Sequence, residues 1–332
     1  MKKIRGFIKG IGHHVPNNVV TNNDLSMHMD TSDEWISSRS GIKERRFVNG
    51  GESTSDLAIP AVENALSDAG ISKEDIDFIV FSTAHPDHYI PGSGCILQDK
   101  MSFPNIGALD IRAQCAGFVY GLSVADQYIR SGEYNNILLV CSEVQSTLME
   151  MNDRGRNVSV LFGDGAAAAV ISSTDEDKGI MSSHIYSDGK HYKKLWAEAP
   201  ATSVNPRIDS DMINRGAQYL SMDGKEVFKH AVKRFPEVIN KALDHNGLSV
   251  DDIDLLIPHQ ANQRISDMVA RSMKLDKDKM VSNIHKFGNT TSASIPIALS
   301  EAKASGKVKD GDIIVCAAFG SGFLYGSNLI RW

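Results

Sequence analysis

Positions 65–80 read ALSDAGISKEDIDFIV, and positions 242–257 read ALDHNGLSVDDIDLLI. Aligned at Gly70 and Gly247, the two stretches share seven of their sixteen residues without a gap. Each is typical of a helix that ends at a glycine, followed by a short acidic turn and a buried apolar strand. Helix–strand units repeated about half a chain length apart predict two similar α/β halves that arose by duplication.

The boundary between the halves is expected near residues 175–178, between strand-like segments at 166–172 and 179–186. This gives an N-terminal half, residues 1–175, and a C-terminal half, residues 176–332. The sequence has no Gly/Ser-rich or Pro-rich linker there. The two halves should therefore pack against each other.

Length and composition narrow the class of protein. The 332 residues are 42% hydrophobic, enough for a large core and two domains. No apolar run approaches the ~20 residues that a membrane span needs. The first twelve residues are too short and too interrupted for a secretion signal, so a cytoplasmic protein without membrane contact is expected. The formal net charge of −6 argues against a general nucleic-acid binder.

The four cysteines are scattered along the chain and form no CxxC pair. Neither a zinc site nor a disulfide framework is therefore expected, and no metal is predicted. Cys141 and Cys316 each end an apolar, strand-like run and are expected in the core. Cys95 follows a Pro/Gly/Ser stretch, and the sequence assigns it no role.

Cys115 is the strongest candidate for chemistry. It lies where a strand-like segment, residues 106–111, turns into a helical pattern beginning near Phe118. Backbone N–H groups and the helix dipole at such a turn favour an anion, so the thiol should ionise more easily and act as a nucleophile. The small residues Ala116 and Gly117 would let a substrate carbonyl approach the sulfur. The alternative interpretation is a buried structural cysteine.

Three further motifs follow predicted strands or precede predicted helices. His259 follows the strand of the second repeat, and ligands collect beyond such strand ends in α/β sheets. Asn289 lies in a turn of small and polar residues. Residues 319–323, FGSGF, would offer backbone N–H groups to a carbonyl oxygen. Each motif alone could be structural, but together with Cys115 they predict an acyl-transfer site.

The chain resembles the β-ketoacyl-acyl carrier protein synthase III family, the initiating condensing enzymes of bacterial fatty-acid synthesis within the thiolase-like superfamily. The similarity runs essentially end to end and rests on six motifs in order: TSDEWI at 31–36 with RSGI at 39–42, CAGF at 115–118, FGDGA at 162–166, PHQAN at 258–262, GNTTS at 288–292 and FGSG at 319–322. The resemblance implies an α/β, thiolase-like fold whose two duplicated halves pack as a five-layer αβαβα arrangement. It also implies a homodimer and no cofactor, with acyl-coenzyme A (acyl-CoA) as a substrate.

Carried over residue by residue, the resemblance implies a ping-pong decarboxylative Claisen condensation. Cys115 would take the acyl group of acyl-CoA as a thioester. A neutral His259 and Asn289 would bind the thioester oxygen of malonyl-acyl carrier protein and stabilise the enolate formed as CO2 leaves. The backbone N–H groups of Cys115 and Ser321 would hold each oxyanion. A Cys/His/Asn set, in place of Cys/His/His, favours a CoA primer.

The same resemblance assigns surfaces to both substrates. Trp35 and Arg154 would sandwich the adenine of CoA. Arg39 and Thr31 would contact its phosphate and ribose, and Asn262 its pantetheine arm. An acidic acyl carrier protein should meet a local basic patch. The residues expected at that patch are Gln260, Arg264, Arg271, Lys229 and Lys233.

Departures from the family pattern leave the primer and the pathway open. The loop at 85–91, HPDHYIP, is unusually polar, and Ile90 in place of an aromatic residue predicts room for a longer or branched primer. Ser321 replaces a glycine but keeps its backbone N–H. The alternatives are a condensing enzyme of secondary metabolism, an acyltransferase with another acceptor, or a non-catalytic scaffold subunit. A hydrolase is disfavoured because no carboxylate is expected near these motifs, although the sequence does not place Glu34 and Glu143.

Overall fold

The computed structural model describes residues 4–332, and in it both copies of the repeat form the predicted helix. The first copy begins in the last turns of α3 (Thr54–Ala69), and the second begins in the last turns of α8 (Gly224–Asn246). Both helices stop at a glycine in the left-handed region, Gly70 with φ of 64° and Gly247 with φ of 67°. Glycine adopts this conformation without a steric penalty, which is why both helices end where the sequence predicts.

A 3-10 turn and a strand follow each of these helices. In both copies a serine–aspartate capping box closes the turn. The elements are η1 (Lys73–Asp75) and β4 (Phe78–Ser82) in the first copy, and η5 (Val250–Asp252) and β11 (Leu255–Pro258) in the second. The predicted helix–turn–strand repeat is confirmed.

Two sheets carry the duplication further. The first has the order β1-β7-β6-β4-β5, and the second has the order β8-β13-β12-β11. The pairings run antiparallel, antiparallel and parallel in both, from β1 to β4 and from β8 to β11. The further strands are β1 (Arg5–His14), β5 (Gly107–Ile111), β6 (Asn136–Glu143), β7 (Gly165–Thr174), β8 (Gly179–Ser187), β12 (Ile313–Gly320) and β13 (Leu324–Arg331).

The matching strands β6 and β12 hold two of the cysteines. Cys141 pairs with Ala167 on β7, and Cys316 pairs with Asn328 on β13. Both thiols are buried, as predicted. The chain passes from the first sheet to the second across residues 175–178, between β7 and β8.

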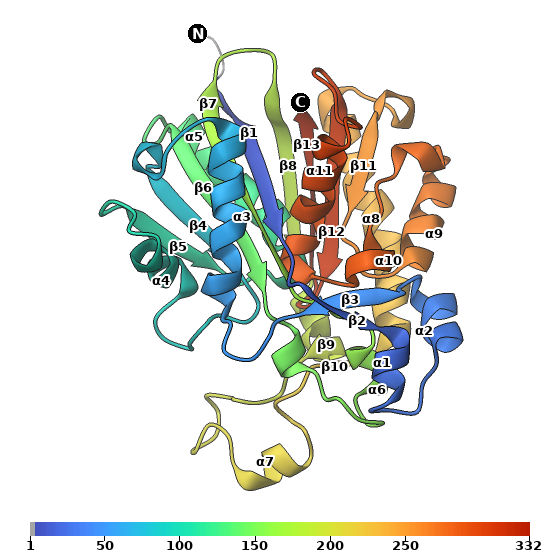
Figure 1. Ribbon diagram of the computed structural model, residues 1–332. Coiled ribbons are helices and arrows are strands. Elements are labelled where there is room, and N and C mark those ends of the chain that lie inside the picture. The colour runs from blue at the N-terminus through green and yellow to red at the C-terminus, as the bar shows by residue number, and fades with distance from the viewer. Residues whose placement is uncertain (1–3) are drawn as a thin grey trace.

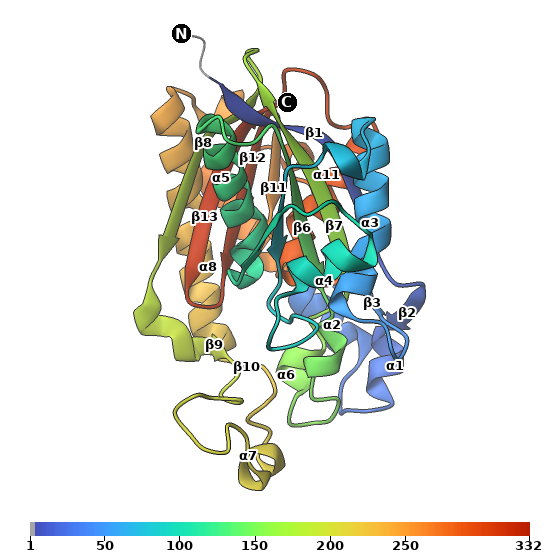
Figure 2. The same ribbon diagram turned by 90° about the vertical axis from the view of Figure 1, so that its left-hand side faces the viewer.

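Helices separate and cover the two sheets (Figures 1 and 2). The middle layer contains α5 (Gly117–Arg130) and α11 (Ser294–Ala304), which contact strands of both sheets. The outer layers are α3 with α4 (Ser93–Lys100) on one side and α8 with α9 (Gln263–Met273) on the other. One hydrophobic core includes residues of both sheets and of the middle helices. The predicted five-layer αβαβα arrangement is confirmed.

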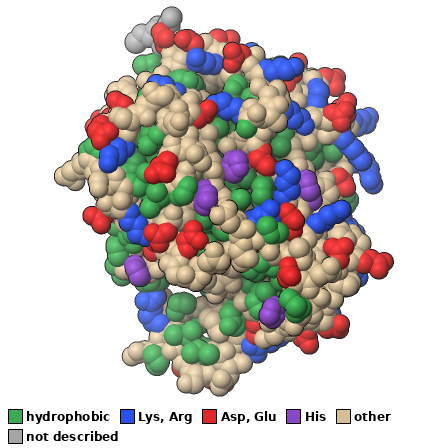
Figure 3. Space-filling view, in the orientation of Figure 1, with side chains coloured by type: hydrophobic (Ala, Val, Ile, Leu, Met, Phe, Trp, Pro, Cys, Tyr) green, Lys and Arg blue, Asp and Glu red, His purple; other side chains and the backbone are tan. Residues whose placement is uncertain are grey.

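The remaining short elements gather at the lower end of the view in Figure 1. They are β2 (Asn18–Thr21), α1 (Asn22–Ser26), α2 (Asp33–Ser40), β3 (Glu44–Phe47), α6 (Arg156–Ser159), β9 (Leu195–Trp196), α7 (Ser210–Asn214), β10 (Ser221–Met222) and α10 (Ile284–Phe287). Figure 3 shows acidic and basic side chains interspersed over this face of the molecule. Among residues 4–332, the helices are too short or too polar to span a bilayer.

Candidate active site

Cys115 lies in a one-turn 3-10 helix, η2 (Gln114–Ala116), between the end of β5 and the start of α5. Two glycines allow close packing around it. A Cβ added at Gly117 would collide with the Ser82 hydroxyl, and one added at Gly320 would collide with Cβ and Sγ of Cys115. The end of β12, in the other half, therefore reaches the thiol because position 320 has no side chain.

The electrostatic surroundings of Cys115 differ from the expectation. Burial, and then the negative charge of Glu143, raise the pKa of the thiol to about 12. The backbone N–H groups of Ser321 and of Cys115 itself act in the opposite direction. The prediction of an easily ionised thiol is wrong for the free protein, because loss of solvation outweighs the helix terminus. The two N–H groups that face the sulfur are those predicted for the oxyanion hole.

His259 follows β11 and is 2% exposed. Its Nδ1 lies 2.7 Å from Oγ of Ser294, and that oxygen also accepts the backbone N–H of Gln260 at 3.3 Å. Among the described residues the Ser294 hydroxyl has no other acceptor. We therefore infer that it donates its hydrogen bond to Nδ1 and that the ring carries its own proton on Nε2. Nε2 has no hydrogen-bond partner among residues 4–332. Burial lowers the His259 pKa to about 3, so the ring is neutral, as the resemblance implies.

Asn289 presents an amide to the same space. Its backbone N–H donates to Leu161 O at 2.8 Å, and the N–H of Gly163 donates to its carbonyl at 3.1 Å. The side-chain Oδ1 accepts the N–H of Thr291 at 2.9 Å, which leaves Nδ2 available as a donor. Asn289, His259 and Cys115 line one cavity of about 80 Å³.

This small cavity lies between two larger ones. A cavity of about 620 Å³ beside Trp35 and Arg39 shares Leu161, Met222, Gly224, Phe228 and Asn262 with it. A cavity of about 490 Å³, which we call the acyl pocket, shares Cys115, Phe162 and Leu195 with it. The three cavities form a route from the surface at Trp35, past Cys115, into the acyl pocket. A long thioester could thus place its carbonyl at the sulfur.

The residues expected to bind CoA are only partly together. The Trp35 ring lies beneath two guanidinium groups, that of Arg39 at 4.6 Å and that of Arg156 at 5.0 Å. Arg154 instead forms a hydrogen-bonded ion pair with Glu150 and donates to Asn214 O at 3.0 Å, so its guanidinium does not stack on Trp35. The sequence reasoning missed Arg156, although it lies two positions after Arg154.

Of the two other predicted CoA contacts, Thr31 and Asn262, only Asn262 lines the cavity beside Trp35. Thr31 precedes α2, and its hydroxyl is buried without a hydrogen-bond partner among the described residues. Asn262 caps α9 by accepting the N–H of Arg264 at 2.9 Å, and it donates to Arg39 O at 3.0 Å. Because Asn262 lines both the surface cavity and the small one, it lies along the route.

Four of the five residues expected at the basic patch are exposed on the packed pair α8 and α9: Lys229, Lys233, Arg264 and Arg271. Gln260 is not among them. It is 1% exposed, donates to Pro258 O at 2.6 Å and accepts the N–H of Asn283 at 3.1 Å. The prediction of a carrier-protein contact at Gln260 is wrong, because its side chain is tied into the interior.

Glu143 is a carboxylate at the site that the sequence did not place. It ends β6, is 0% exposed and accepts hydrogen bonds from the Ser292 hydroxyl, the Ala84 N–H at 3.1 Å and Gln145 Nε2 at 3.1 Å. Its charge acts on Cys115. The expectation that no carboxylate lies near these motifs is therefore wrong. Glu143 ties the ends of β4 and β6 to the turn that carries Ser292.

We expect Glu143 to make stability fall as pH rises. Burial raises its pKa from 4.5 to about 7 in the folded protein, so between these values the folded state holds a proton that the unfolded state has lost. Relative to Glu143→Gln, the wild type should lose about 3 kcal/mol of unfolding free energy between pH 4.5 and pH 7. Urea denaturation of both proteins across this range measures the difference. A difference that stays constant with pH would show that Glu143 is already ionised in the fold.

The described residues contain no group of three His, Cys, Asp or Glu side chains that could hold a metal ion.

Comparisons with known proteins define first the class and then the family. Similar solved structures include 3-oxoacyl-[acyl-carrier-protein] synthases III, which have the thiolase-like fold, and the chain is an acyltransferase of that class. Residues 109–189 match the family model described as 3-oxoacyl-[acyl-carrier-protein (ACP)] synthase III, and residues 243–332 match its C-terminal model. The chain belongs to the β-ketoacyl-acyl carrier protein synthase III family.

Three relatives illustrate this similarity. The β-ketoacyl-[acyl-carrier-protein] synthase III of Caldanaerobacter subterraneus is 42% identical, with 100% of this chain and 99% of that protein covered. The crystal structure of 3-oxoacyl-[acyl-carrier-protein] synthase III from Aquifex aeolicus has a TM-score of 0.91 at 38% identity, covering 98% and 100%. The priming β-ketosynthase of the R1128 polyketide pathway has a TM-score of 0.90 at 31% identity, covering 98% and 96%.

Proposed function

We propose that this chain condenses an acyl-CoA primer with malonyl-acyl carrier protein, giving 3-oxoacyl-acyl carrier protein, CoA and CO2, and so initiates fatty-acid synthesis. The observation that carries the proposal is the single cavity in which Cys115 faces the unpaired donors of His259 and Asn289. The names of the relatives support the same reaction.

In the first half-reaction, CoA enters past Trp35 and Arg39, with Asn262 as a further contact along the route. Sγ of Cys115 attacks the thioester carbonyl, the bond from that carbon to the CoA sulfur breaks, and the thiol proton ends on the departing CoA. The N–H groups of Cys115 and Ser321 stabilise the oxyanion of the tetrahedral intermediate. Acyl-Cys115 and free CoA result.

In the second half-reaction, Nε2–H of His259 and Nδ2 of Asn289 donate to the thioester oxygen of the malonyl group. The bond to the carboxylate breaks, CO2 leaves, and its electron pair forms an enolate that these donors stabilise. The enolate carbon attacks the acyl-Cys115 carbonyl. The Cys115 sulfur then leaves and takes up a proton, which restores the thiol.

The direct test supplies the enzyme with acyl-CoA and malonyl-acyl carrier protein and measures CO2 and the 3-oxoacyl product. Acyl-Cys115 without a 3-oxoacyl product would indicate an acyltransferase with another acceptor. No acyl-enzyme with any thioester would indicate a scaffold subunit. A priming role in secondary metabolism is the second candidate, favoured by the likeness to the R1128 ketosynthase. Preference for the carrier protein of such a pathway would support it.

Carrier-protein docking on α8 and α9 leads to a prediction about charge. Reversing Lys229 and Lys233 to glutamate should raise the KM for the acidic carrier protein about tenfold at low salt and less at high salt, because the attraction is screened. Acylation by acyl-CoA should stay within about twofold. Steady-state assays at two ionic strengths measure both effects. Reversing the exposed Lys307 and Lys309 is the matched control, and an equal rise in KM there would contradict docking on α8.

We infer a homodimer that forms along β5. This strand ends the first sheet, and its backbone pairs with β4 on one side only. Unpaired strand edges favour pairing with another chain. Tyr89 and Ile90 lie in the nearby 85–91 loop and are 57% and 80% exposed. Ile90 does not line the acyl pocket of its own chain. Sedimentation equilibrium tests the inference, and a monomer at micromolar concentration would reject it.

A further inference from the structure

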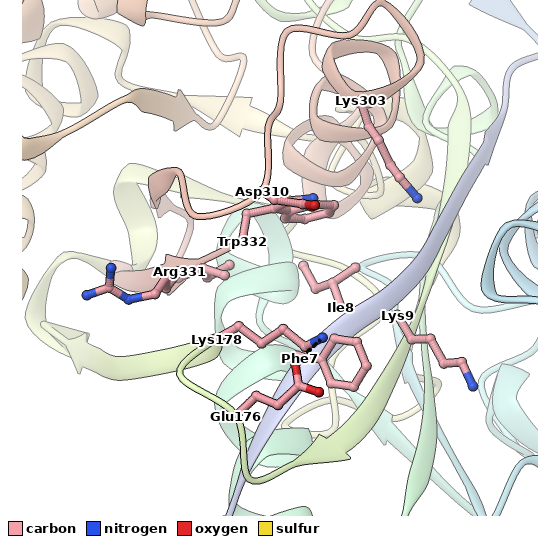
Figure 4. Close-up of a pocket in the computed structure, with 10 residues that line it drawn as sticks. Phe7, Ile8, Lys9, Glu176, Lys178, Lys303, Asp310, Arg331 and Trp332 are labelled. Atoms are coloured by element: carbon pink, nitrogen blue, oxygen red, sulfur yellow. Dashed lines mark ion pairs between the residues drawn. The ribbon is translucent and has the colours of Figure 1, made fainter.

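A separate cavity lies at the end of the molecule opposite Cys115 (Figure 4). It has a volume of about 440 Å³ and shares no lining residue with the three cavities of the route. Its charges are largely paired within the chain. Lys178 lies 2.7 Å from Glu176, Lys303 pairs with Asp68, and Arg331 faces Asp177 at 3.8 Å. Of the described charged residues that line it, Lys9 and Asp310 form no ion pair, and their charges are opposite, so the cavity has no excess charge of one sign to attract a ligand.

The acyl pocket is different, because one of its walls is polar. Leu148, Phe162 and Leu195 also line it, as expected for an alkyl chain. Arg112 and Gln114 lie on the polar wall and immediately precede Cys115 in the chain. A group extending from the sulfur would therefore pass beside them.

The polar wall carries hydrogen-bonding capacity that the described residues do not use. Gln145 is 1% exposed and its Oε1 has no partner, although its Nε2 donates to Glu143. His85 Nδ1 and Gln218 Oε1 are also buried without partners. Unpaired buried polar atoms are unfavourable, and in native proteins each one needs a ligand, a water or another explanation.

Arg112 adds a net charge to this wall. Within residues 4–332 its guanidinium forms no ion pair and no side-chain hydrogen bond. Burial, and then the charge of Arg112, lower the pKa of His85 to about 4, so the neighbouring ring is neutral and Arg112 remains the cation. The nearby carboxylate of Glu143 is already bound to Ser292, Ala84 and Gln145. Arg112 is exposed, so water solvates its charge until an anion that enters the pocket pairs with it.

We propose that this wall selects an acyl primer that ends in a carboxylate, which Arg112 binds. The inference rests on the proposed function and names its substrate class. A planar guanidinium can donate two parallel hydrogen bonds to a carboxylate. The phosphates of CoA do not fill this role, because their expected contacts lie at the far end of the route, beside Trp35 and Arg39. An acetyl or branched alkyl primer would leave Arg112 without a partner.

The step itself is the ordinary acylation. Sγ of Cys115 forms a bond to the thioester carbonyl, the bond to the CoA sulfur breaks, and CoA leaves with the thiol proton. The distal carboxylate of the primer takes no part in bond changes and stays ionised against Arg112. The preference for a carboxylated primer should therefore be measurable as a faster rate of Cys115 acylation.

The experiment measures that rate by intact-protein mass spectrometry with thioesters matched in chain length. The pairs are succinyl-CoA with butyryl-CoA, glutaryl-CoA with pentanoyl-CoA, and adipyl-CoA with hexanoyl-CoA. We expect at least one carboxylated member to react about 10- to 100-fold faster than its neutral partner, the size of a charge-assisted hydrogen-bonded contact. Arg112→Gln should remove this advantage and leave the neutral rates within about threefold, while Arg112→Lys should keep part of it.

Arg331→Gln, at the cavity of Figure 4, is the matched loss of an arginine charge and should change neither rate. Neutral primers that acylate as fast as their carboxylated partners would overturn the inference and leave the proposed function standing. Equal slowing of both classes by Arg112→Gln, or loss of the dimer in that variant, would make Arg112 structural and also overturn it. Failure of every thioester would reject the proposed function itself.

Discussion

Cys115→Ala is expected to abolish acyl transfer. The wild type should gain the mass of one acyl group from acyl-CoA, and the variant should gain none. Formation of the 3-oxoacyl product should fall on the order of 10⁴-fold or more, because the enolate then has no acyl-enzyme to attack. The fold should survive, because the change removes only a sulfur atom. Intact-protein mass spectrometry and a product assay measure both effects.

The other thiols supply the control. Cys95 is exposed, and Cys95→Ala should be acylated like the wild type. A general thiol reagent at neutral pH should label Cys95 before Cys115, because burial and Glu143 raise the Cys115 pKa to about 12. Acyl-CoA should label only Cys115 if, as proposed, it binds along the route and its oxyanion is held by the N–H groups of Cys115 and Ser321. A mass gain in Cys115→Ala equal to that of the wild type would place the nucleophile elsewhere.

The fold was largely predictable because its signals are local and occur twice. A glycine that ends a helix, a serine–aspartate turn and an apolar strand each depend on a few neighbouring residues, and 65–80 and 242–257 contain all three. The shared strand order of the two sheets follows from the same duplication. The missing counterpart of β5 was not predictable, because near Met280 the second half forms only an isolated bridge to Leu256.

Predictability at the site depended on whether a residue acts through its chain position or through its packing. The structure brings Cys115, His259, Asn289 and the Ser321 N–H together where strands end or helices begin, and such positions can be read from sequence. Burial cannot be read in this way. It reverses the expected ionisation of Cys115, points Gln260 into the interior next to His259, and brings Glu143 to the site from the end of β6.

The two half-reactions should separate when the donors are removed. His259→Ala and Asn289→Ala should each lower 3-oxoacyl formation about 10²- to 10³-fold, the usual cost of one donor to a developing oxyanion. Acylation of Cys115 should stay within about threefold, because the donors proposed for that step are the N–H groups of Cys115 and Ser321. Mass spectrometry follows the acyl-enzyme, and CO2 release follows the second step. Equal losses in both steps would instead mean that the substitutions disturb the whole cavity.

Ser294→Ala tests the position of the His259 ring proton that the condensation step requires. The Ser294 hydroxyl lies 2.7 Å from Nδ1 of His259 and fixes the ring proton on Nε2, where the enolate oxygen needs a donor. Without it, the neutral ring can place its proton on either nitrogen, so condensation should slow about tenfold while acylation stays unchanged. Because burial lowers the His259 pKa to about 3, the wild-type condensation rate should show no inflection near pH 6.5. An inflection there would show that a protonated imidazolium takes part in the step. Nε2 would then act as an acid and not as a neutral hydrogen-bond donor.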